Sequence, residues 1–259
     1  MLPSVDFCGL NVTRLVLGAN PFGGYSHQTP QRDQAMVNYY TPEKIIETWH
    51  RAEAAGINTM VTNNETPHVT EAVKRYLGSG GKLQWIAQVG TPSLEAMPGC
   101  VDAAIAIGAK AFYFHGMWMD NLFAAHDEKT LRAWVAHARR HRVPVGAAAH
   151  NPLTHYWMDS LDLLDFHVVC FFNCGSVHAR SGHRFRLTDA IAATECIRRL
   201  RKPCVGYKIM AAGRIDAAMA FEYAFDNIKS TDVVNVGMFR GDKDDMVEEN
   251  AAIVQRLLS

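Results

Sequence analysis

The chain alternates eight times between a short apolar run and an amphipathic stretch with helical spacing. Regular alternation of strand and helix predicts a parallel sheet, and eight such units in a row predict a closed (β/α)₈ TIM barrel. The length of 259 residues fits one barrel of this kind, for which about 250 residues are typical. We therefore expect a single α/β domain over residues 1–259.

The expected elements follow from apolar spacing and from capping residues. A small hairpin over Asp6–Val12, with Gly9-Leu10-Asn11 as its turn, precedes the barrel. The stretch from Asn20 to Tyr40 has no helical period, which predicts a long functional loop or lid. Thr41 begins the next helix as its N-cap. The eight expected strands are Thr13–Leu17, Ile57–Val61, Leu83–Val89, Ala111–Phe114, Pro144–Ala149, Phe166–Phe172, Cys204–Ile209 and Val233–Val236.

The charge balance does not indicate a charged partner. Lys plus Arg and Asp plus Glu both number 26, which argues against a nucleic-acid or acidic-lipid surface. No apolar stretch reaches the roughly 18 residues that a membrane span requires, and the N-terminus lacks the pattern of a signal peptide. The six cysteines are scattered, which predicts free thiols. We expect a cytoplasmic protein with a small-molecule substrate and without a nucleic-acid or membrane partner.

In a TIM barrel the active site collects residues at the C-terminal ends of the strands. Four candidate catalytic residues hold such positions: Glu65, His115, His150 and Lys208. An imidazole or a carboxylate can transfer a proton, and a desolvated Lys can act as a base, a Schiff-base amine or an anchor for an anion. Each also has a structural alternative, namely a helix cap for Glu65, a buried backbone-bonded ring for His115, a turn for His150 and a solvated rim position for Lys208.

Three of these residues are also candidate metal ligands. Glu65, His115 and His150 follow the second, fourth and fifth expected strands. Two imidazoles and one carboxylate are a common ligand set for zinc, manganese or iron(II). The sequence thus allows a divalent metal at the barrel mouth.

Further strand-end residues are candidates for binding a substrate. Amides both donate and accept hydrogen bonds, so several of them near one mouth suit a polyhydroxylated or carbonyl compound. An Arg beside a helix N-terminus suits a phosphate or carboxylate, and a Trp can form an apolar or sugar-stacking wall. The candidates are Asn20, Asn63, Asn64, Gln88, Asn151, Asn173, Trp118 and Arg214, which we place with Gly213 at the start of a helix.

Short motifs over almost the whole chain share one pattern. They are Gly9–Gly18, Phe22-Gly23-Gly24, Ala55-Gly56-Ile57-Asn58, His115 with Asp120, Gly146–Pro152, Val236-Gly237-Met238 and Glu248-Glu249-Asn250. Together they resemble the aldo-keto reductase superfamily. The resemblance implies a barrel with an N-terminal hairpin and an NADP(H) cofactor, whose phosphates would be held here by Gly237, Met238 and Asn250.

The catalytic residues that the resemblance implies are largely replaced. Members of the family use a Tyr general acid, a Lys, an Asp and a His. In this sequence the Asp position falls near Val61, no Tyr occurs between Asn63 and Pro67, and the Lys position holds Gln88. His115 corresponds to the family's His. Protonating an alkoxide needs a donor with a tuned pKa, so the usual reductase mechanism is not predicted.

Three hypotheses follow. The first is a reductase-like barrel that performs non-redox acid–base or metal-assisted chemistry, of lyase, isomerase or hydrolase type, on a small sugar-like or keto substrate. The second is an atypical NADP-dependent oxidoreductase with His115 as its proton donor. The third is a ligand-binding barrel without catalytic activity.

Overall fold

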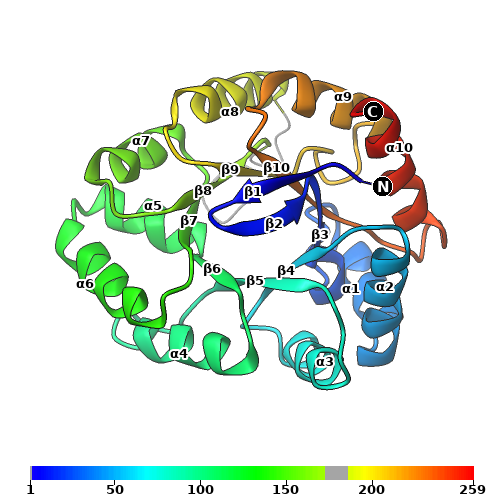
Figure 1. Ribbon diagram of the computed structural model, residues 1–259, viewed down its shortest axis with the longest axis horizontal. Coiled ribbons are helices and arrows are strands. Elements are labelled where there is room, and N and C mark those ends of the chain that lie inside the picture. The colour runs from blue at the N-terminus through cyan, green and yellow to red at the C-terminus, as the bar shows by residue number, and fades with distance from the viewer. Residues whose placement is uncertain (1, 173–185) are drawn as a thin grey trace.

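The computed structural model describes residues 2–172 and 186–259, and eight parallel strands within them close into a barrel (Figure 1). The predicted TIM barrel is therefore confirmed. Each strand is hydrogen-bonded to the next along the chain, and the last strand pairs with the first. The strands are β3 (Leu15–Gly18), β4 (Thr59–Asn63), β5 (Gln84–Val89), β6 (Ala111–Phe114), β7 (Val145–Ala149), β8 (Phe166–Cys170), β9 (Cys204–Tyr207) and β10 (Val233–Gly237).

A two-stranded hairpin, β1 (Ser4–Phe7) and β2 (Leu10–Thr13), lies in front of the barrel in Figure 1. The predicted hairpin exists, but the predicted turn is wrong by two residues. Phe7 pairs with Leu10, so the turn is Cys8-Gly9, and both of its φ angles are positive, at 57° and 86°. Two positive φ angles are what a tight hairpin turn of this length requires. Phe7 closes this end of the barrel by packing edge-on against Phe166, with ring centroids 5.2 Å apart.

Helices surround the barrel (Figure 1), and side chains cap several of them, including the predicted N-cap Thr41. Thr41 accepts a hydrogen bond from the N–H of Lys44 at the start of α2, and Asp127 accepts one from Thr130 at the start of α6. Beginning after the first barrel strand and ending after the last, these helices are α2 (Pro42–Ala54), α3 (Pro67–Gly78), α4 (Met97–Ile107), α5 (Gly116–Ala124), α6 (Glu128–Ala138) with the 3₁₀ turn η2 (Arg139–His141), α7 (Pro152–Leu161), α8 (Leu187–Arg199), α9 (Ala217–Asn227) and α10 (Met246–Leu257).

The predicted loop between Asn20 and Tyr40 is wrong. It contains a 3₁₀ turn, η1 (Asn20–Gly23), and a helix, α1 (Pro30–Tyr39), whose N-cap Thr29 accepts a hydrogen bond from Arg32. Met36 is the one fully buried residue of α1, so this helix has no apolar stripe from which a helical period could be read.

Alternate residues of each strand point into the barrel. One apolar cluster fills the interior next to the hairpin, and it includes Val16, Ile86, Tyr113, Phe166 and Val205. Moving two residues further along several strands replaces apolar side chains with polar ones, for example Ile86 with Gln88. The barrel is therefore packed at the hairpin end and polar at the opposite end.

Gly146 of β7 leaves room for the ring of Phe166 on the next strand. A Cβ added at Gly146 would lie 2.3–2.6 Å from three atoms of that ring. Because Phe166 is fully buried between Phe7 and Tyr113, its ring has little room to move. We expect Gly146→Ala to lower the free energy of unfolding by about 1–3 kcal/mol, measured by chemical denaturation. The control is Gly99→Ala in α4, where an added Cβ meets nothing within 4 Å and stability should not fall; equal losses in both variants would contradict this account.

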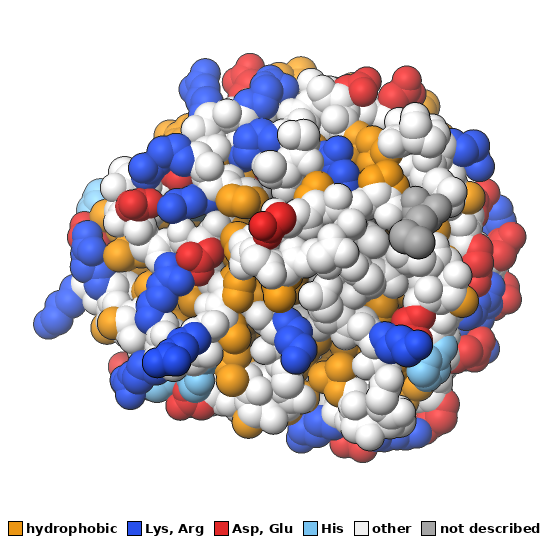
Figure 2. All heavy atoms as spheres, in the orientation of Figure 1, with side chains coloured by type: hydrophobic (Ala, Val, Ile, Leu, Met, Phe, Trp, Pro, Cys, Tyr) orange, Lys and Arg blue, Asp and Glu red, His pale blue; other side chains and the backbone are white. Residues whose placement is uncertain are grey.

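The hairpin face of the surface carries both signs of charge. Figure 2 shows Lys and Arg side chains interspersed with Asp and Glu around the rim of this face. In the part of the chain that the structure describes, no helix combines the length and apolar character needed to cross a membrane.

Candidate active site

A cavity of about 490 Å³ lies at the C-terminal ends of the barrel strands. Its volume falls within the range of roughly 300–1,000 Å³ that is usual for small-molecule sites. Polar or titratable side chains from seven strand ends and loops line it, namely Asn20, Asn63, Glu65, Gln88, His115, His150, Tyr207, Lys208 and Asn235. The predicted collection of strand-end residues is therefore present as one pocket.

The side of the cavity is closed by two segments, the loop before α1 and α1 (Pro30–Tyr39) itself, which contact the loops after β9 and β10. Gln28 donates a hydrogen bond of 2.7 Å from Nε2 to the carbonyl oxygen of Ala212. Arg32 forms an ion pair with Asp242 and lies over the ring of Phe239, with 4.7 Å from the guanidinium carbon to the ring centroid. The segment expected to be a loop or lid thus contributes a helix to the wall of the pocket.

The turn after β9 has a strained backbone. Lys208, Ala211 and Ala212 have φ angles of 58°, 52° and 57°, although none of them is a glycine. A left-handed conformation costs a non-glycine residue about 1–2 kcal/mol, and such costs are frequent at functional sites. Lys208 lines the cavity, with its Nζ 5.5 Å from the centroid of the Tyr207 ring, so its predicted place at the mouth holds.

His150 is held by Asp120, a residue of α5. Asp120 Oδ2 accepts hydrogen bonds from His150 Nδ1 at 2.9 Å and from the His150 backbone N–H at 3.1 Å. Its other oxygen accepts a hydrogen bond of 2.8 Å from the Thr154 hydroxyl. Both side chains are nearly buried, with 11% of His150 and 12% of Asp120 exposed. The ring therefore has a fixed orientation, with Nδ1 toward the carboxylate.

The protonation of this pair follows from the same contacts. Burial favours the neutral acid, but the hydrogen bonds from His150 and Thr154 outweigh it and leave the pKa of Asp120 below its ordinary value. A carboxylate only accepts hydrogen bonds, so it selects the imidazole tautomer with the proton on Nδ1. Nε2 is the ring nitrogen that this carboxylate does not bind, and the residue lines the cavity.

A second pair lies on the floor of the cavity. The hydroxyl of Tyr113 donates a hydrogen bond of 3.1 Å to Oε1 of Gln88 on the neighbouring strand. Burial raises the pKa of Tyr113 well above its usual range, so the phenol stays protonated. With Oε1 occupied, the amide nitrogen of Gln88 is the group suited to donate toward a ligand.

Glu65 lies at the rim, against the backbone of the loop after β5. The carboxylate lies directly over Gly90, where an added Cβ would come within 2.1–2.5 Å of its atoms. Although the residue as a whole is exposed, crowding around the carboxyl raises its pKa.

Asn235 in β10 presents an unsatisfied acceptor. Its Oδ1 is buried and has no hydrogen-bond partner among the described residues, and the residue lines the cavity. A Cβ at Gly18 on the next strand would lie 2.6 Å from this oxygen. A buried unpaired carbonyl costs about 1–3 kcal/mol, which a ligand donor would recover.

Among the predicted substrate ligands, Asn20, Asn63 and Gln88 line the cavity. The Oδ1 of Asn63 also accepts hydrogen bonds from the N–H groups of Glu65 and Thr66, so it shapes the loop after β4. His115 lines the cavity too, at the N-cap position of α5, and its backbone N–H donates to Val89.

Four predicted substrate ligands lie outside the cavity. The amide of Asn64 exchanges two hydrogen bonds with the backbone of Gly90, and Asn151 caps α7 by accepting from Leu153. Trp118 packs on the core, with its ring centroid 6.4 Å from that of Trp134. These three residues have structural roles that explain their positions. Asn173 lies outside the described residues.

Arg214 is the fourth predicted substrate ligand outside the cavity, and its predicted place at the start of a helix is wrong. The next helix, α9, begins at Ala217 with Asp216 as its N-cap. Arg214 instead donates to the carbonyl oxygens of Ala211 and His27, both at 3.2 Å, and so connects the β9 turn to the loop before α1.

Of the three residues predicted to hold cofactor phosphates, one lines the cavity and two do not. Gly237 lines the cavity, where an added Cβ would meet Pro21 at 2.6 Å. Met238 and Asn250 are buried, at 0% and 3% exposure, and they do not line the cavity. Tyr40 also donates a hydrogen bond of 2.7 Å to the Met238 carbonyl.

The three predicted metal ligands, Glu65, His115 and His150, do not converge on one point in this structure. Their ligand atoms do not all come within 4.8 Å of one another, and the one described group of three that does is Asp102, His137 and His141, outside the barrel mouth. His150 is turned toward Asp120, and the carboxylate of Glu65 lies over Gly90, which explains why the set does not converge.

Several residues of the site were not predicted from the sequence. Asp120 is part of the family resemblance, but it lies within a helix rather than at a strand end. Tyr113, Tyr207 and Asn235 lie inside strands, where alternation was the usable signal: each faces inward because its neighbours two residues away do. A polar residue in an otherwise apolar strand, such as Asn235, is informative for this reason.

The fold can now be compared with known proteins. A structure described as a "putative aldo-keto reductase" from Pseudomonas aeruginosa superposes with a TM-score of 0.70 at 17% identity, over 99% of this chain and 94% of the other. The chain has the fold of an aldo-keto reductase. The resemblance inferred from sequence is confirmed at this level.

Other barrels superpose as well. Orotidine 5'-monophosphate decarboxylase from Methanocaldococcus jannaschii gives a TM-score of 0.63 at 12% identity, over 96% of this chain and 99% of the other. An archaeal fructose 1,6-bisphosphate aldolase gives 0.53 at 12% identity, over 93% of both chains. No family model and no curated protein matches the sequence.

Proposed function

We propose that this protein is an enzyme that moves protons on a small polar substrate without hydride transfer, in a lyase, isomerase or hydrolase type of reaction. The observation that carries this proposal is the Asp120–His150 pair at the cavity, with Nδ1 of the imidazole fixed by a buried carboxylate. A base oriented by a third group in this way is the arrangement that activates protons in many acid–base enzymes.

His150 is the general base in this proposal. Ionised Asp120 orients the ring and stabilises the imidazolium that forms when Nε2 takes a proton from the substrate. Asp120 does not touch the substrate, so its role is positioning. His115, at the end of the neighbouring strand, and Glu65, whose pKa is raised, are the candidates for returning a proton.

Two groups suit negative charge that develops on a substrate oxygen. Lys208 brings a cation to the mouth, and the amide nitrogen of Gln88 is oriented by the phenol of Tyr113. Fixed donors of this kind stabilise an enolate or alkoxide in a site shielded from water. Asn20, Asn63 and Asn235 add amides that match hydroxyl or carbonyl groups, which supports a sugar-like or keto compound as substrate.

Two observations favour this reaction class over NADP-dependent reduction. The cavity contains Tyr113, Tyr207 and Lys208, but the positions at which the resemblance implies the catalytic Asp and Lys hold Val61 and Gln88, and no Tyr occurs between Asn63 and Pro67. Met238 and Asn250, the expected phosphate ligands, are buried. Fold similarity to enzymes that include a decarboxylase and an aldolase is compatible with either class.

The proposal is tested by incubating the protein in D₂O with a panel of ketoses, 2-keto acids and hydroxy acids and recording proton NMR spectra. We expect deuterium incorporation, or turnover, at carbon next to a carbonyl in one compound class, without added nicotinamide. His150→Gln should abolish it, whereas His50→Gln, on the exposed face of α2, should not. Tight NADPH binding with hydride transfer to an aldehyde would overturn the proposal.

A further inference from the structure

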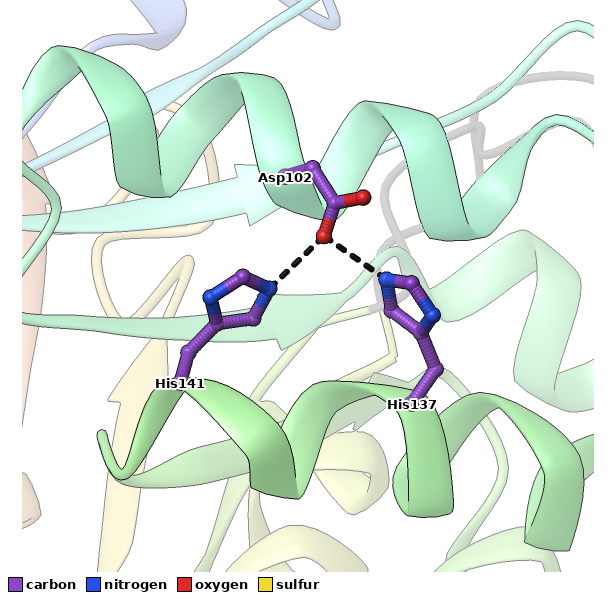
Figure 3. Close-up of side chains that lie close together, drawn as sticks. All are labelled: Asp102, His137 and His141. Carbon is purple, nitrogen blue, oxygen red and sulfur yellow. Dashed lines mark hydrogen bonds and ion pairs between the residues drawn. The ribbon is translucent and has the colours of Figure 1, made fainter.

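Two histidines and an aspartate converge on the outside of the barrel, away from the candidate active site. His137 lies in the last turn of α6 and His141 in the following 3₁₀ turn, η2, while Asp102 belongs to α4. Nε2 of each imidazole is 2.7 Å from the same oxygen, Oδ1 of Asp102. Figure 3 shows both rings reaching up from one helical segment to the carboxylate of the other helix.

We propose that Asp102, His137 and His141 form a zinc-binding site that connects α4 to the end of α6. Zn²⁺ binds imidazole nitrogen and carboxylate oxygen as well as cysteine sulfur. Two His residues four positions apart on a helix present their rings on one face. The three ligand atoms already lie within 4.8 Å of one another. A fourth position would hold water.

The distances suit a metal after a small adjustment. Bonds of about 2.0–2.2 Å to a tetrahedral ion place neighbouring ligand atoms roughly 3.3–3.5 Å apart. Moving from 2.7 Å to that separation requires less than 1 Å, and the Asp102 carboxylate, 49% exposed, is able to make it. The rings are more confined, with 18% of His137 and 25% of His141 exposed, so less rotamer freedom is lost on binding.

The backbone beneath the site is fixed by packing of the two helical regions. Trp134 of α6 donates a hydrogen bond of 3.2 Å from its indole N–H to the carbonyl of Leu94, just before α4. The two histidine rings also meet edge to face, with centroids 6.0 Å apart. A metal here would therefore brace existing packing rather than bring distant elements together.

Arg140 opposes the tautomer of His137 that a metal requires, so replacing it tests the proposal. Its guanidinium is 3.1 Å from Nδ1 of His137, so it donates to that nitrogen while Nε2 carries the proton. Metal binding at Nε2 requires the opposite tautomer, with the proton on Nδ1, and Arg140 cannot accept it. Arg140→Gln supplies a carbonyl oxygen that can accept from Nδ1–H and removes a positive charge. Because groups that orient metal-bound imidazoles change affinity by about 10–100-fold, we expect this variant to bind zinc roughly tenfold more tightly.

The test uses the full-length protein, freed of any tag and stripped with a chelator. Zn²⁺ is titrated calorimetrically, and Co²⁺ is titrated by visible absorption, whose intense bands report tetrahedral nitrogen and oxygen ligation. We expect one site, and thermal stability that rises with the Zn²⁺ concentration. His137→Ala and His141→Ala should each abolish both effects, with folding checked by circular dichroism.

Two control variants at histidines outside the cluster show whether the metal binds at Asp102, His137 and His141. His150→Gln should retain the site, since it alters only the barrel mouth, and His50→Ala should retain it because His50 lies on α2. Undiminished binding in the His137→Ala/His141→Ala double variant, or weaker binding in Arg140→Gln, would overturn the proposal. The absence of binding in the wild-type protein would overturn it as well.

Discussion

Replacing Asp120 by Asn is expected to lower kcat of the proton-transfer reaction by about 10²–10⁴-fold while leaving the fold intact. An amide oxygen in the place of Oδ2 can still accept from Nδ1 and from the backbone N–H of His150, with the NH₂ group toward Thr154, but the amide carries no negative charge. The imidazolium that forms when Nε2 takes a proton then lacks a neighbouring negative charge, so the ring is a weaker base. Initial rates with the compound identified in the exchange screen give the measurement, and thermal unfolding monitors the fold.

Thr154→Val is the matched control for this variant. It removes the hydrogen bond to Asp120 Oδ1 but keeps the carboxylate and both bonds to His150. We expect a loss of less than about tenfold, because the negative charge beside the imidazole is preserved. A full-sized loss in Thr154→Val, or a near-normal rate in Asp120→Asn, would show that the negative charge of Asp120 does not support proton transfer by His150.

The barrel itself was predictable because its signal is repeated. Each strand is a short apolar run between turn residues, and an error at one end, such as β4 beginning at Thr59 instead of Ile57, does not change the order of elements. α1 was missed for the opposite reason. It covers the side of a pocket, so burial imposes no apolar stripe on it.

The candidate site was predictable in place but only partly in composition. The rule for strand ends located His115, His150 and Lys208 at the cavity because a barrel fixes where strand ends lie. It could not say which polar groups point at one another. His150 is paired with Asp120 from a helix, and this contact depends on how α5 packs over β7, which no local pattern encodes.

The same limit explains why two predicted amides lie outside the cavity and why the three predicted metal ligands do not converge. Asn64 and Asn151 follow strands as expected, but Asn64 bonds to the backbone of the neighbouring loop at Gly90 and Asn151 to the first turn of its own helix. Short polar side chains commonly bond to nearby backbone in this way, so an Asn after a strand is as often a cap as a ligand. Glu65, His115 and His150 lie at the same edge of the barrel, but their ligand atoms do not all lie close to one another.

Acidification should destabilise the protein well above the pH at which carboxylates titrate. His155 of α7 and His167 of β8 are fully buried, and their Nδ1 atoms are 3.2 Å apart. Burial, reinforced by the neighbouring His167, lowers the pKa of His155 to about 3 from an ordinary 6.5. Burial lowers the pKa of His167 as well, despite the nearby Asp159. Hydrogen bonding between two ring nitrogens requires at least one neutral partner, so the pair cannot bind two protons in place.

The sign of the effect follows from proton counting. Below pH 6.5 the unfolded chain binds a proton on His155, and the folded protein does not until about pH 3. The stabilisation is complete above pH 6.5 and is lost as the pH falls, at up to about 1.4 kcal/mol per pH unit. Asp159, whose pKa is lowered to about 2 chiefly by the nearby His167, with Nε2 3.6 Å from Oδ1, contributes only below its ordinary value of 3.8. The two effects therefore occupy separate pH ranges.

We expect the free energy of unfolding to fall by about 2 kcal/mol between pH 7 and pH 5 because of His155 alone. For a chain of this size that corresponds to a decrease in Tm of roughly 4–8 °C. His155→Leu should reduce this slope whatever its effect on stability at pH 7, because Leu has no proton to bind. His50→Leu, at an exposed position on α2, should leave the slope unchanged. Equal slopes in the wild-type protein and in His155→Leu would exclude the buried histidine as the acid-sensitive group.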